Sequence, residues 1–192
     1  MGVTSPLQPD EATFDGNSVA DFDETADPED DGSNINAFAQ FMRATKAPPR
    51  QPSANSLNAF AGADLFRKAD CDVCHVPTIV TAPVGTVING GAFIVPPALG
   101  NKIIHPFSDF LLHDVGTGDG IVQNGGPDTQ FKLRTPPLWG LRTRTRFMHD
   151  LQSLTLMQAI RRHSGEASTT VDYFNSLSVF EQQQLIAFLN SL

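Results

Sequence analysis

Two cysteines and a histidine supply the densest chemistry in the chain, in the run Cys71-Asp72-Val73-Cys74-His75. Two thiols three positions apart can each bond to one vinyl edge of a porphyrin, and Cys-x-x-Cys-His is the attachment signature of a c-type haem. The histidine directly after the second cysteine then falls beneath the iron and can coordinate it through a ring nitrogen. These are the only two cysteines in the 192 residues, so no other thiol competes for this role.

Three other uses of the motif fit the sequence less well. A thioredoxin-like redox pair is expected within a strand–helix–strand unit, and no strand-rich run surrounds Cys71. A structural zinc ion needs four ligands, and a second Cys/His pair at finger spacing is absent from the sequence. A disulfide between residues so close together would constrain little chain. The motif therefore favours one covalent haem c.

A haem iron bound by His75 has a second axial position, and the ligand there decides the chemistry. Met148 is the strongest candidate, because it lies outside any predicted helix and follows His75 by 73 residues, which is far enough to reach the opposite haem face. Its neighbour His149 could compete, although adjacent residues in an extended segment point to opposite sides. Met42 and Met157 lie on apolar helix faces, where packing is the commoner role. The remaining candidates are His105, His113 and His163.

Net charge is −8 and is concentrated near the start of the chain. Residues 1–32 hold ten of the 21 acidic residues and no Lys or Arg, so the rest of the chain is close to neutral. This balance argues against nucleic acid and anionic membrane surfaces as partners. No apolar run reaches spanning length, and the pattern of a signal peptide is absent. Covalent haem attachment normally takes place outside the cytoplasm, so we expect a periplasmic or other extracytoplasmic location.

One acidic segment resembles a calcium loop. Asp27, Glu29 and Asp31 alternate with other residues and are followed by Gly32, as in an EF-hand. The twelfth position is Phe38, where a bidentate Glu is needed. We therefore expect a solvated acidic loop in place of a calcium site.

Apolar periodicity predicts helices over about 34–45, 57–69, 155–163 and 178–192, with a further helical turn or two between 166 and 177. Ser33 or Asn34 should cap the first helix and Asn55 or Ser56 the second. Thr155-x-x-Gln158 and Ser178-x-x-Glu181 are capping boxes for the other two. A small hairpin is expected across Asn89-Gly90-Gly91.

The predicted helices each have an apolar face. Ile35, Phe38, Phe41 and Met42 form one in the first helix. The inner side expected for the second helix comprises Leu57, Phe60, Ala61, Leu65 and Phe66, and that of the last helix Phe180, Leu185, Phe188, Leu189 and Leu192. The predicted fold is mainly α: a cytochrome c-like helical domain around one covalent haem, with long loops, over residues 33–192. Residues 1–32 are predicted to form an acidic, mostly irregular arm.

Several segments together resemble a known family. They read RTPPLWGL, FMHD and TL-x-x-AI between Leu133 and Ile160, CDVCHVPT at Cys71–Thr78, IHPFSDFLLHDVG at Ile104–Gly116, HSGE at His163–Glu166 and FAQFMRATKAPP at Phe38–Pro49. The chain resembles the C-terminal haem domain of bacterial di-haem cytochrome c peroxidases over roughly residues 20–192. It looks closer still to the di-haem oxidoreductase, or thiol-oxidoreductase-like, branch of that superfamily.

The resemblance implies roles for particular residues. Met148 occupies the position of the methionine that is the distal ligand of the electron-transferring haem in the superfamily. The family usually continues His-Asp-Gly there, whereas this chain has His149-Asp150-Leu151. Those enzymes reduce peroxide at a second haem domain, and this chain has no second Cys-x-x-Cys-His motif. Related enzymes also hold calcium between their two domains.

Two further residues have weaker claims on the haem. Arg142, among the arginines near the Met148 loop, could pair with a propionate, and Trp139 could pack on the porphyrin edge. Surface charge and ordinary core packing are the alternatives for these two residues.

The sequence thus predicts single-electron transfer by a His75/Met148 haem, to or from a redox partner protein or a second haem domain. The alternative is a haem peroxidase or oxidoreductase with an open or labile distal site. Peroxidase activity is not expected from this chain alone, because the peroxidatic half of the resembled enzymes is missing.

Overall fold

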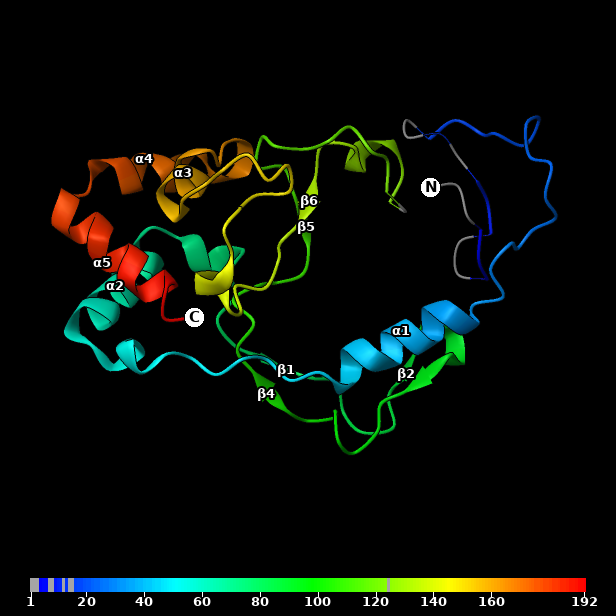
Figure 1. Cartoon of the computed structure of the whole chain (residues 1–192), viewed down its shortest axis with the longest axis horizontal. Helices are drawn as coiled ribbons and strands as arrows, with labels where there is room; N and C mark the ends of the chain where they lie inside the picture. Colours follow the sequence, from blue (N-terminus) through cyan, green and yellow to red (C-terminus); the bar gives the residue numbers. More distant parts are fainter. Residues whose placement is uncertain (1–3, 7–8, 12, 14–15, 124) are drawn as a thin grey trace. The chain divides into compact units, whose positions relative to one another are not determined.

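The computed structural model describes residues 4–6, 9–11, 13, 16–123 and 125–192 (Figure 1). The chain divides into two compact units, each built from separated stretches of sequence. Unit 1 comprises Met1–Pro48, Asp114–Leu133 and Arg146–Glu166. Unit 2 comprises Pro49–His113, Arg134–Thr145 and Ala167–Leu192. The predicted boundary between an arm and a haem domain coincides with the start of the first helix and stays a prediction.

Unit 2 is organised by two helices that pack side by side, α2 (Leu57–Lys68) and α5 (Val179–Leu189), drawn in cyan and red in Figure 1. Three aromatic rings form the centre of the packing. The Phe66 ring lies 5.3 Å from that of Phe188 and 6.1 Å from that of Phe107, and the last two are 5.7 Å apart, all measured between centroids. Such edge-to-face contacts add to the burial of apolar surface.

Gly62 allows this close approach of the two helices. A Cβ at Gly62 would lie 2.0 Å from the carbonyl oxygen of Gln184 and 2.8 Å from Cβ of Phe188. Neither a backbone carbonyl nor a Cβ can move aside as the end of a flexible side chain can. The glycine is thus required by the packing of α2 against α5.

The remaining helices are α4 (Ser168–Ser176) in unit 2, and α1 (Ser33–Ala44) and α3 (Leu156–Arg161) in unit 1. Short 3-10 helices span Pro52–Asn55, Cys71–Val73, Asn89–Gly91, Pro127–Thr129, Leu141–Thr143 and Gly165–Ala167. The predicted turn or two between 166 and 177 is therefore a full helix. Among the described residues, no helix is both long and apolar enough to span a bilayer.

Each of the six strands found among the described residues has two residues. Strands β1 (Ile79–Val80) and β4 (Ile103–Ile104) pair antiparallel, as do β2 (Val87–Ile88) and β3 (Phe93–Ile94). The second pair confirms the hairpin predicted across Asn89–Gly91. Strands β5 and β6 are Leu112–His113 and Leu133–Arg134. The prediction of a mainly α chain is confirmed in part. Helices and long loops dominate, but short strands within the loops pair with one another.

Three of the predicted helix caps are confirmed. The Ser56 side chain accepts a hydrogen bond from the Ala59 amide, and that of Thr155 accepts one from the Gln158 amide. At the start of α5 the capping box is complete: the Ser178 side chain accepts from the Glu181 amide, and the Glu181 carboxylate accepts from the Ser178 amide at 2.9 Å. These bonds satisfy amides that no helical carbonyl reaches.

Three expectations about the helices were wrong. The cap of α1 is Gly32, with φ of 84°, because its left-handed backbone turns the chain into the helix before Ser33. On α2, Leu57 and Phe60 are not on the inner side: they are 87% and 57% exposed. The partner helix α5 covers α2 along Ala59, Gly62, Leu65 and Phe66 instead, so the buried stripe is narrower than the apolar one. Phe180, at the start of α5, is likewise 61% exposed.

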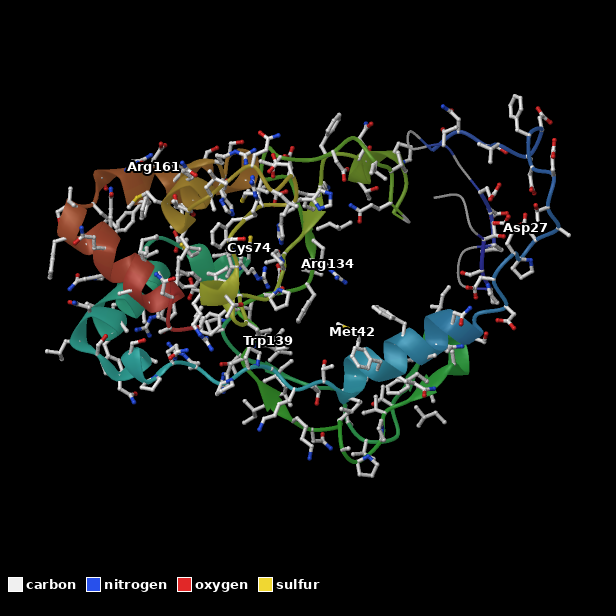
Figure 2. All side chains as sticks on the ribbon, in the orientation of Figure 1. Asp27, Met42, Cys74, Arg134, Trp139 and Arg161 are labelled. Atoms are coloured by element: carbon white, nitrogen blue, oxygen red, sulfur yellow. The ribbon has the colours of Figure 1, made fainter. Side chains whose placement is uncertain are left out.

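Helix α1 buries none of its residues. The predicted apolar face is present but exposed, and comprises Ile35, Phe38, Phe41 and Met42, the last labelled in Figure 2. Before α1, the acidic segment binds the backbone and a buried threonine. Thr4 donates through its hydroxyl to Asp27, and its Oγ1 accepts from the Glu29 amide at 3.0 Å. These contacts engage two carboxyl-bearing residues of the segment that resembled a calcium loop.

Replacing Gly62 with alanine should destabilise unit 2, because the new methyl group meets the Gln184 carbonyl. We expect a loss of about 1–3 kcal/mol in the free energy of unfolding, as for an overpacked core. Urea unfolding followed by circular dichroism measures it. Leu57→Ala, on the same helix but exposed, is the control and should change the free energy by less than about 0.5 kcal/mol. Equal effects of the two variants would contradict the packing of α2 on α5.

Candidate functional site

The motif residues form a single helical turn directly after α2. Cys71–Val73 are a 3-10 helix that follows Asp70, whose φ is 57°. The His75 amide donates to the Cys71 carbonyl at 2.9 Å, which closes the turn. Positions i and i+3 of a helical turn lie on the same side. The two cysteines, half-buried and not joined by a disulfide, are therefore presented together.

The imidazole of His75 has a defined orientation. Its Nδ1 lies 3.0 Å from the backbone carbonyl oxygen of Phe107. A carbonyl only accepts hydrogen bonds, so Nδ1 carries the proton and Nε2 carries the lone pair. The Phe66 ring packs beside it, with 6.2 Å between ring centroids. This is the arrangement in which a histidine ligates a metal through Nε2 while its other nitrogen is fixed by the protein.

The loop before β5 is bound to the motif through its backbone. The amide of Ser108 donates to the Val76 carbonyl at 3.1 Å, and that of Asp109 donates to the Cys74 carbonyl at 2.8 Å. Ser108 is fully buried, and its hydroxyl donates to the Thr135 carbonyl. Three segments far apart in the sequence are thereby joined around the cysteines, all within unit 2.

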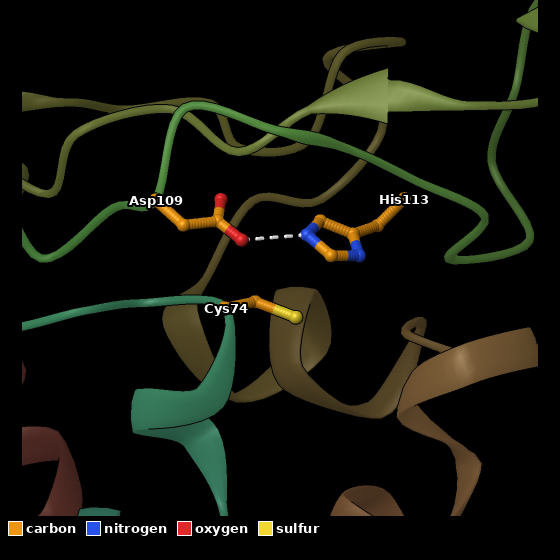
Figure 3. Close-up of side chains that lie close together, drawn as sticks. All are labelled: Cys74, Asp109 and His113. Carbon is orange, nitrogen blue, oxygen red and sulfur yellow. Dashed lines mark hydrogen bonds and ion pairs between the residues drawn. The ribbon is translucent and has the colours of Figure 1, made fainter.

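Asp109 and His113 lie beside Cys74, whose side chain points toward the hydrogen-bonded pair (Figure 3). Oδ2 of Asp109 is 2.8 Å from Nε2 of His113. Burial acts to raise the pKa of Asp109, but hydrogen bonds from the Leu111 amide and from His113 outweigh it and lower the pKa below its usual range. His113, a candidate ligand in the sequence, is thus hydrogen-bonded, whereas Asp109 was not among the candidates. The spacing of four residues between them was the one available signal.

The thiol of Cys71 is largely buried. Burial and the neighbouring carboxylates of Asp72 and Asp70 raise its pKa to about 12. The group is therefore a protonated thiol at neutral pH. Two thiols on one turn, followed by an imidazole held through Nδ1, form a donor set that fits a covalently attached haem with His75 as iron ligand.

Met148 lies in unit 1, whereas the Cys-x-x-Cys-His motif lies in unit 2. It is half-buried and has a φ of 65°. The loop around it is closed by a hydrogen bond from the Phe147 amide to the Ser153 carbonyl at 2.9 Å. Its neighbour His149 is bound through Nε2 to Asp119 at 2.8 Å. The structure thus gives His149 a carboxylate partner within its own unit.

The same loop is fixed by an ion pair to Arg162, the residue that ends α3. Arg162 donates two hydrogen bonds to the Asp150 carboxylate and a third to the Ser153 hydroxyl at 3.1 Å. The hydrogen bonds from Arg162 and from the Gln152 amide lower the pKa of Asp150 to about 2. Asp150 is thus ionised at neutral pH and restrains the loop that carries Met148.

Trp139 and Arg142 are both bound to backbone carbonyls of unit 2. The indole Nε1 of Trp139 donates to the His105 carbonyl at 2.7 Å (Figure 2). Arg142 donates to the carbonyls of Leu192 at 3.1 Å and Pro49 at 3.3 Å. Both side chains hold distant parts of the unit together, and their contacts with a haem stay predictions.

Replacing Leu151 with glycine should stabilise the Met148 loop. Leu151 has a φ of 58°, a conformation that costs a side-chain-bearing residue about 1–2 kcal/mol. Its side chain is 56% exposed, so little burial is lost. We expect a gain of up to about 1 kcal/mol in unfolding free energy, measured by urea titration. Leu154 is equally exposed but has no positive φ, so Leu154→Gly should lower the unfolding free energy. If both variants lower it, backbone strain at Leu151 is excluded.

His163 should make stability depend on pH. Burial lowers the pKa of this histidine below its usual 6.5, and its Nδ1 donates to the Ala159 carbonyl at 2.8 Å. The unfolded chain therefore binds a proton at a higher pH than the folded one, so stability is lost as pH falls below about 6.5. Replacement by glutamine removes this titration. The stability advantage of the wild type over His163→Gln should shrink between about pH 7.5 and 5.5, and a constant difference would contradict the shift.

The chain matches known proteins at the level of family and fold. The family model described as "Di-haem oxidoreductase, putative peroxidase" matches residues 1–192. No curated protein matches. Among solved structures, a chain of Kuenenia stuttgartiensis hydrazine synthase, studied under 20 bar of xenon, is similar with a TM-score of 0.52 and 21% identity. The match covers 82% of this chain and 55% of the hydrazine synthase chain, so this chain spans about half of it.

The similarity to hydrazine synthase is too low in identity to carry function and concerns the fold alone. The family match extends over the whole sequence, and it agrees with the resemblance of the segments around Cys71, Ile104 and Leu133. A haem-based redox role follows from this family. The chain belongs to the di-haem oxidoreductase family.

Proposed function

We propose that this chain binds one c-type haem, covalently, through Cys71 and Cys74, and that it transfers single electrons. The observation that carries the proposal is the hydrogen bond between Nδ1 of His75 and the Phe107 carbonyl, at 3.0 Å. It fixes the tautomer and the ring plane of a histidine that directly follows two thiols on one turn. When bound there, the haem supplies a one-electron couple of iron.

The protein groups around His75 have defined tasks in this proposal. The Phe107 carbonyl keeps the proton on Nδ1 and makes Nε2 a better electron donor. The Phe66 ring, which is 3% exposed as a residue, places an apolar group beside the imidazole. A low-dielectric environment of this kind is one of the properties that set a haem potential. These contacts would keep the His75 imidazole in one orientation in both oxidation states of the iron.

Met148 is the proposed second axial ligand. It stands in a loop whose neighbouring side chains are already bound: His149 to Asp119, and Asp150 to Arg162. A thioether is a soft ligand that favours ferrous iron and leaves no open position for peroxide. These properties support electron transfer over peroxide chemistry. The description of the family as a peroxidase favours the alternative, an open or labile distal site, which the experiment below separates.

The partner and location follow from the same proposal. An electron carrier needs a redox partner protein or a second haem domain, and the family name implies two haems. Haem attachment through thioethers points to an extracytoplasmic location. Arg142 and Trp139 keep their proposed places near the haem, with Arg142 also holding the Leu192 carbonyl.

Removing the thioether of Met148 tests the ligation. The ferric wild-type protein should show a weak far-red band from sulfur-to-iron charge transfer, and Met148→Ala should lose it and turn high-spin. Absorption and electron paramagnetic resonance spectra measure this. Peroxide should react slowly with the wild type and at least about tenfold faster with the variant, because a coordination position has opened.

Met157→Ala is the matched control, since Met157 is a half-buried methionine of α3 in the same unit as Met148. Its spectrum should equal that of the wild type. Intact mass should show one haem on the wild type and none on a Cys71→Ser/Cys74→Ser double variant. A high-spin wild type that reacts quickly with peroxide, unchanged by Met148→Ala, would exclude Met148 as ligand and establish the peroxidase alternative.

A further inference from the structure

Cys74 belongs to a second constellation besides the haem motif. Its sulfur, a carboxylate oxygen of Asp109 and a ring nitrogen of His113 all lie within 4.8 Å of one another, and each residue is half-buried (Figure 3). In the part of the chain that the structure describes, no other set of three His, Cys, Asp or Glu side chains converges in this way. The three residues come from two segments of unit 2 separated by more than thirty positions.

The backbone holds these side chains together. The Asp109 amide donates to the Cys74 carbonyl at 2.8 Å, which fixes the two residues against each other. Oδ1 of Asp109 accepts from the Leu111 amide at 2.9 Å, and Oδ2 binds Nε2 of His113 at 2.8 Å. The side chains of His113 and Asp109 are only 18% and 12% exposed. The cluster is therefore pre-arranged and mostly withdrawn from water.

Its donor set has the chemistry of a zinc site. Thiolate sulfur, imidazole nitrogen and carboxylate oxygen bind Zn²⁺ at about 2.0–2.3 Å, and three such protein ligands with one water complete a tetrahedron. Ligands on one zinc ion are then roughly 3–4 Å apart, so small rotations of these three side chains suffice. Calcium and magnesium prefer oxygen ligands. We propose that Cys74, Asp109 and His113 bind a zinc ion in the chain before haem is attached.

The alternative zinc ligands are those of the motif itself: Cys71, Cys74 and His75. The Nδ1 of His75 is bound to the Phe107 carbonyl, so Nε2 would be its ligand atom, and this set supplies two sulfurs and no carboxylate. The two sets differ in their number of sulfur ligands, which is one for the proposed site and two for the motif. This difference makes them distinguishable by spectroscopy.

Zinc and haem exclude each other at Cys74, because both require its sulfur. This consequence rests on the proposed haem attachment. Zinc binding at this site would protect the Cys74 thiol until the haem arrives, and the metal must leave before the thioether forms. A thioether is a poor zinc ligand, so the haem-loaded chain should have lost the site.

The test uses the full chain produced without haem. Zn²⁺ is titrated against it in competition with a chromophoric chelator, and Co²⁺ serves as a visible probe. We expect one ion per chain, tetrahedral cobalt bands and charge transfer from a single thiolate. Cys74→Ser, Asp109→Asn and His113→Gln should each weaken binding by about 10–100-fold or more. Cys71→Ser and His105→Gln, the second at an exposed histidine bound to Thr78, should bind as the wild type does.

Circular dichroism shows whether each variant folds, and X-ray absorption at the zinc edge counts sulfur ligands in the wild type without any substitution. Two sulfurs, or an equal loss in Cys71→Ser and Cys74→Ser, would overturn the proposal, as would the absence of stoichiometric binding. These measurements need no haem, so they fail or succeed independently of ligation by Met148. Full retention of zinc by the haem-loaded chain would also overturn it, since the thioether could not be a ligand.

Discussion

The hydrogen bond from His75 to the Phe107 carbonyl depends on the packing of the core. Phe107 has a φ of 51°, which turns its carbonyl toward the motif, and its ring packs against Phe66 and Phe188. Those two rings belong to α2 and α5, whose approach requires Gly62. The tautomer of His75 thus depends on the packing of α2 against α5. A change in the α2–α5 contact would reach this carbonyl through the rings of Phe66 and Phe188, so the orientation of His75 depends on the core packing.

Local features of the structure were readable from the sequence. Thr155 and Ser178 were identified as caps, and Ser56 as one of two candidates, because a cap is a contact between residues two or three positions apart. The hairpin of β2 and β3 follows from Asn89–Gly91, whose glycines at 90 and 91 adopt φ of 62° and 108°. The Cys-x-x-Cys-His motif is equally local, since its chemistry is set by spacing within one turn. Family membership was likewise visible in short segments.

Contacts between distant residues could not be read in the same way. Nothing in the sequence places Asp109 beside Cys74, because that contact depends on how a long loop returns to the motif. Apolar periodicity identified Leu65 and Phe66 on the buried face of α2 but also included Leu57 and Phe60, which are exposed. The sequence shows that Leu151 stands where the family usually has a glycine. It does not show that Leu151 adopts the left-handed backbone conformation, which the structure reveals. The contacts made by Arg142 are likewise long-range.

The assembly of unit 2 from three separated stretches has a consequence for the order of events during synthesis. Helix α2 leaves the ribosome long before α5, which supplies its partner rings and the Gln184 carbonyl. Chains dominated by such long-range contacts fold slowly, because distant segments must meet before any stabilisation is gained. Until residues 179–189 have been made, Cys71 and Cys74 belong to an unfinished core. Both thiols therefore remain accessible until α5 has docked on α2.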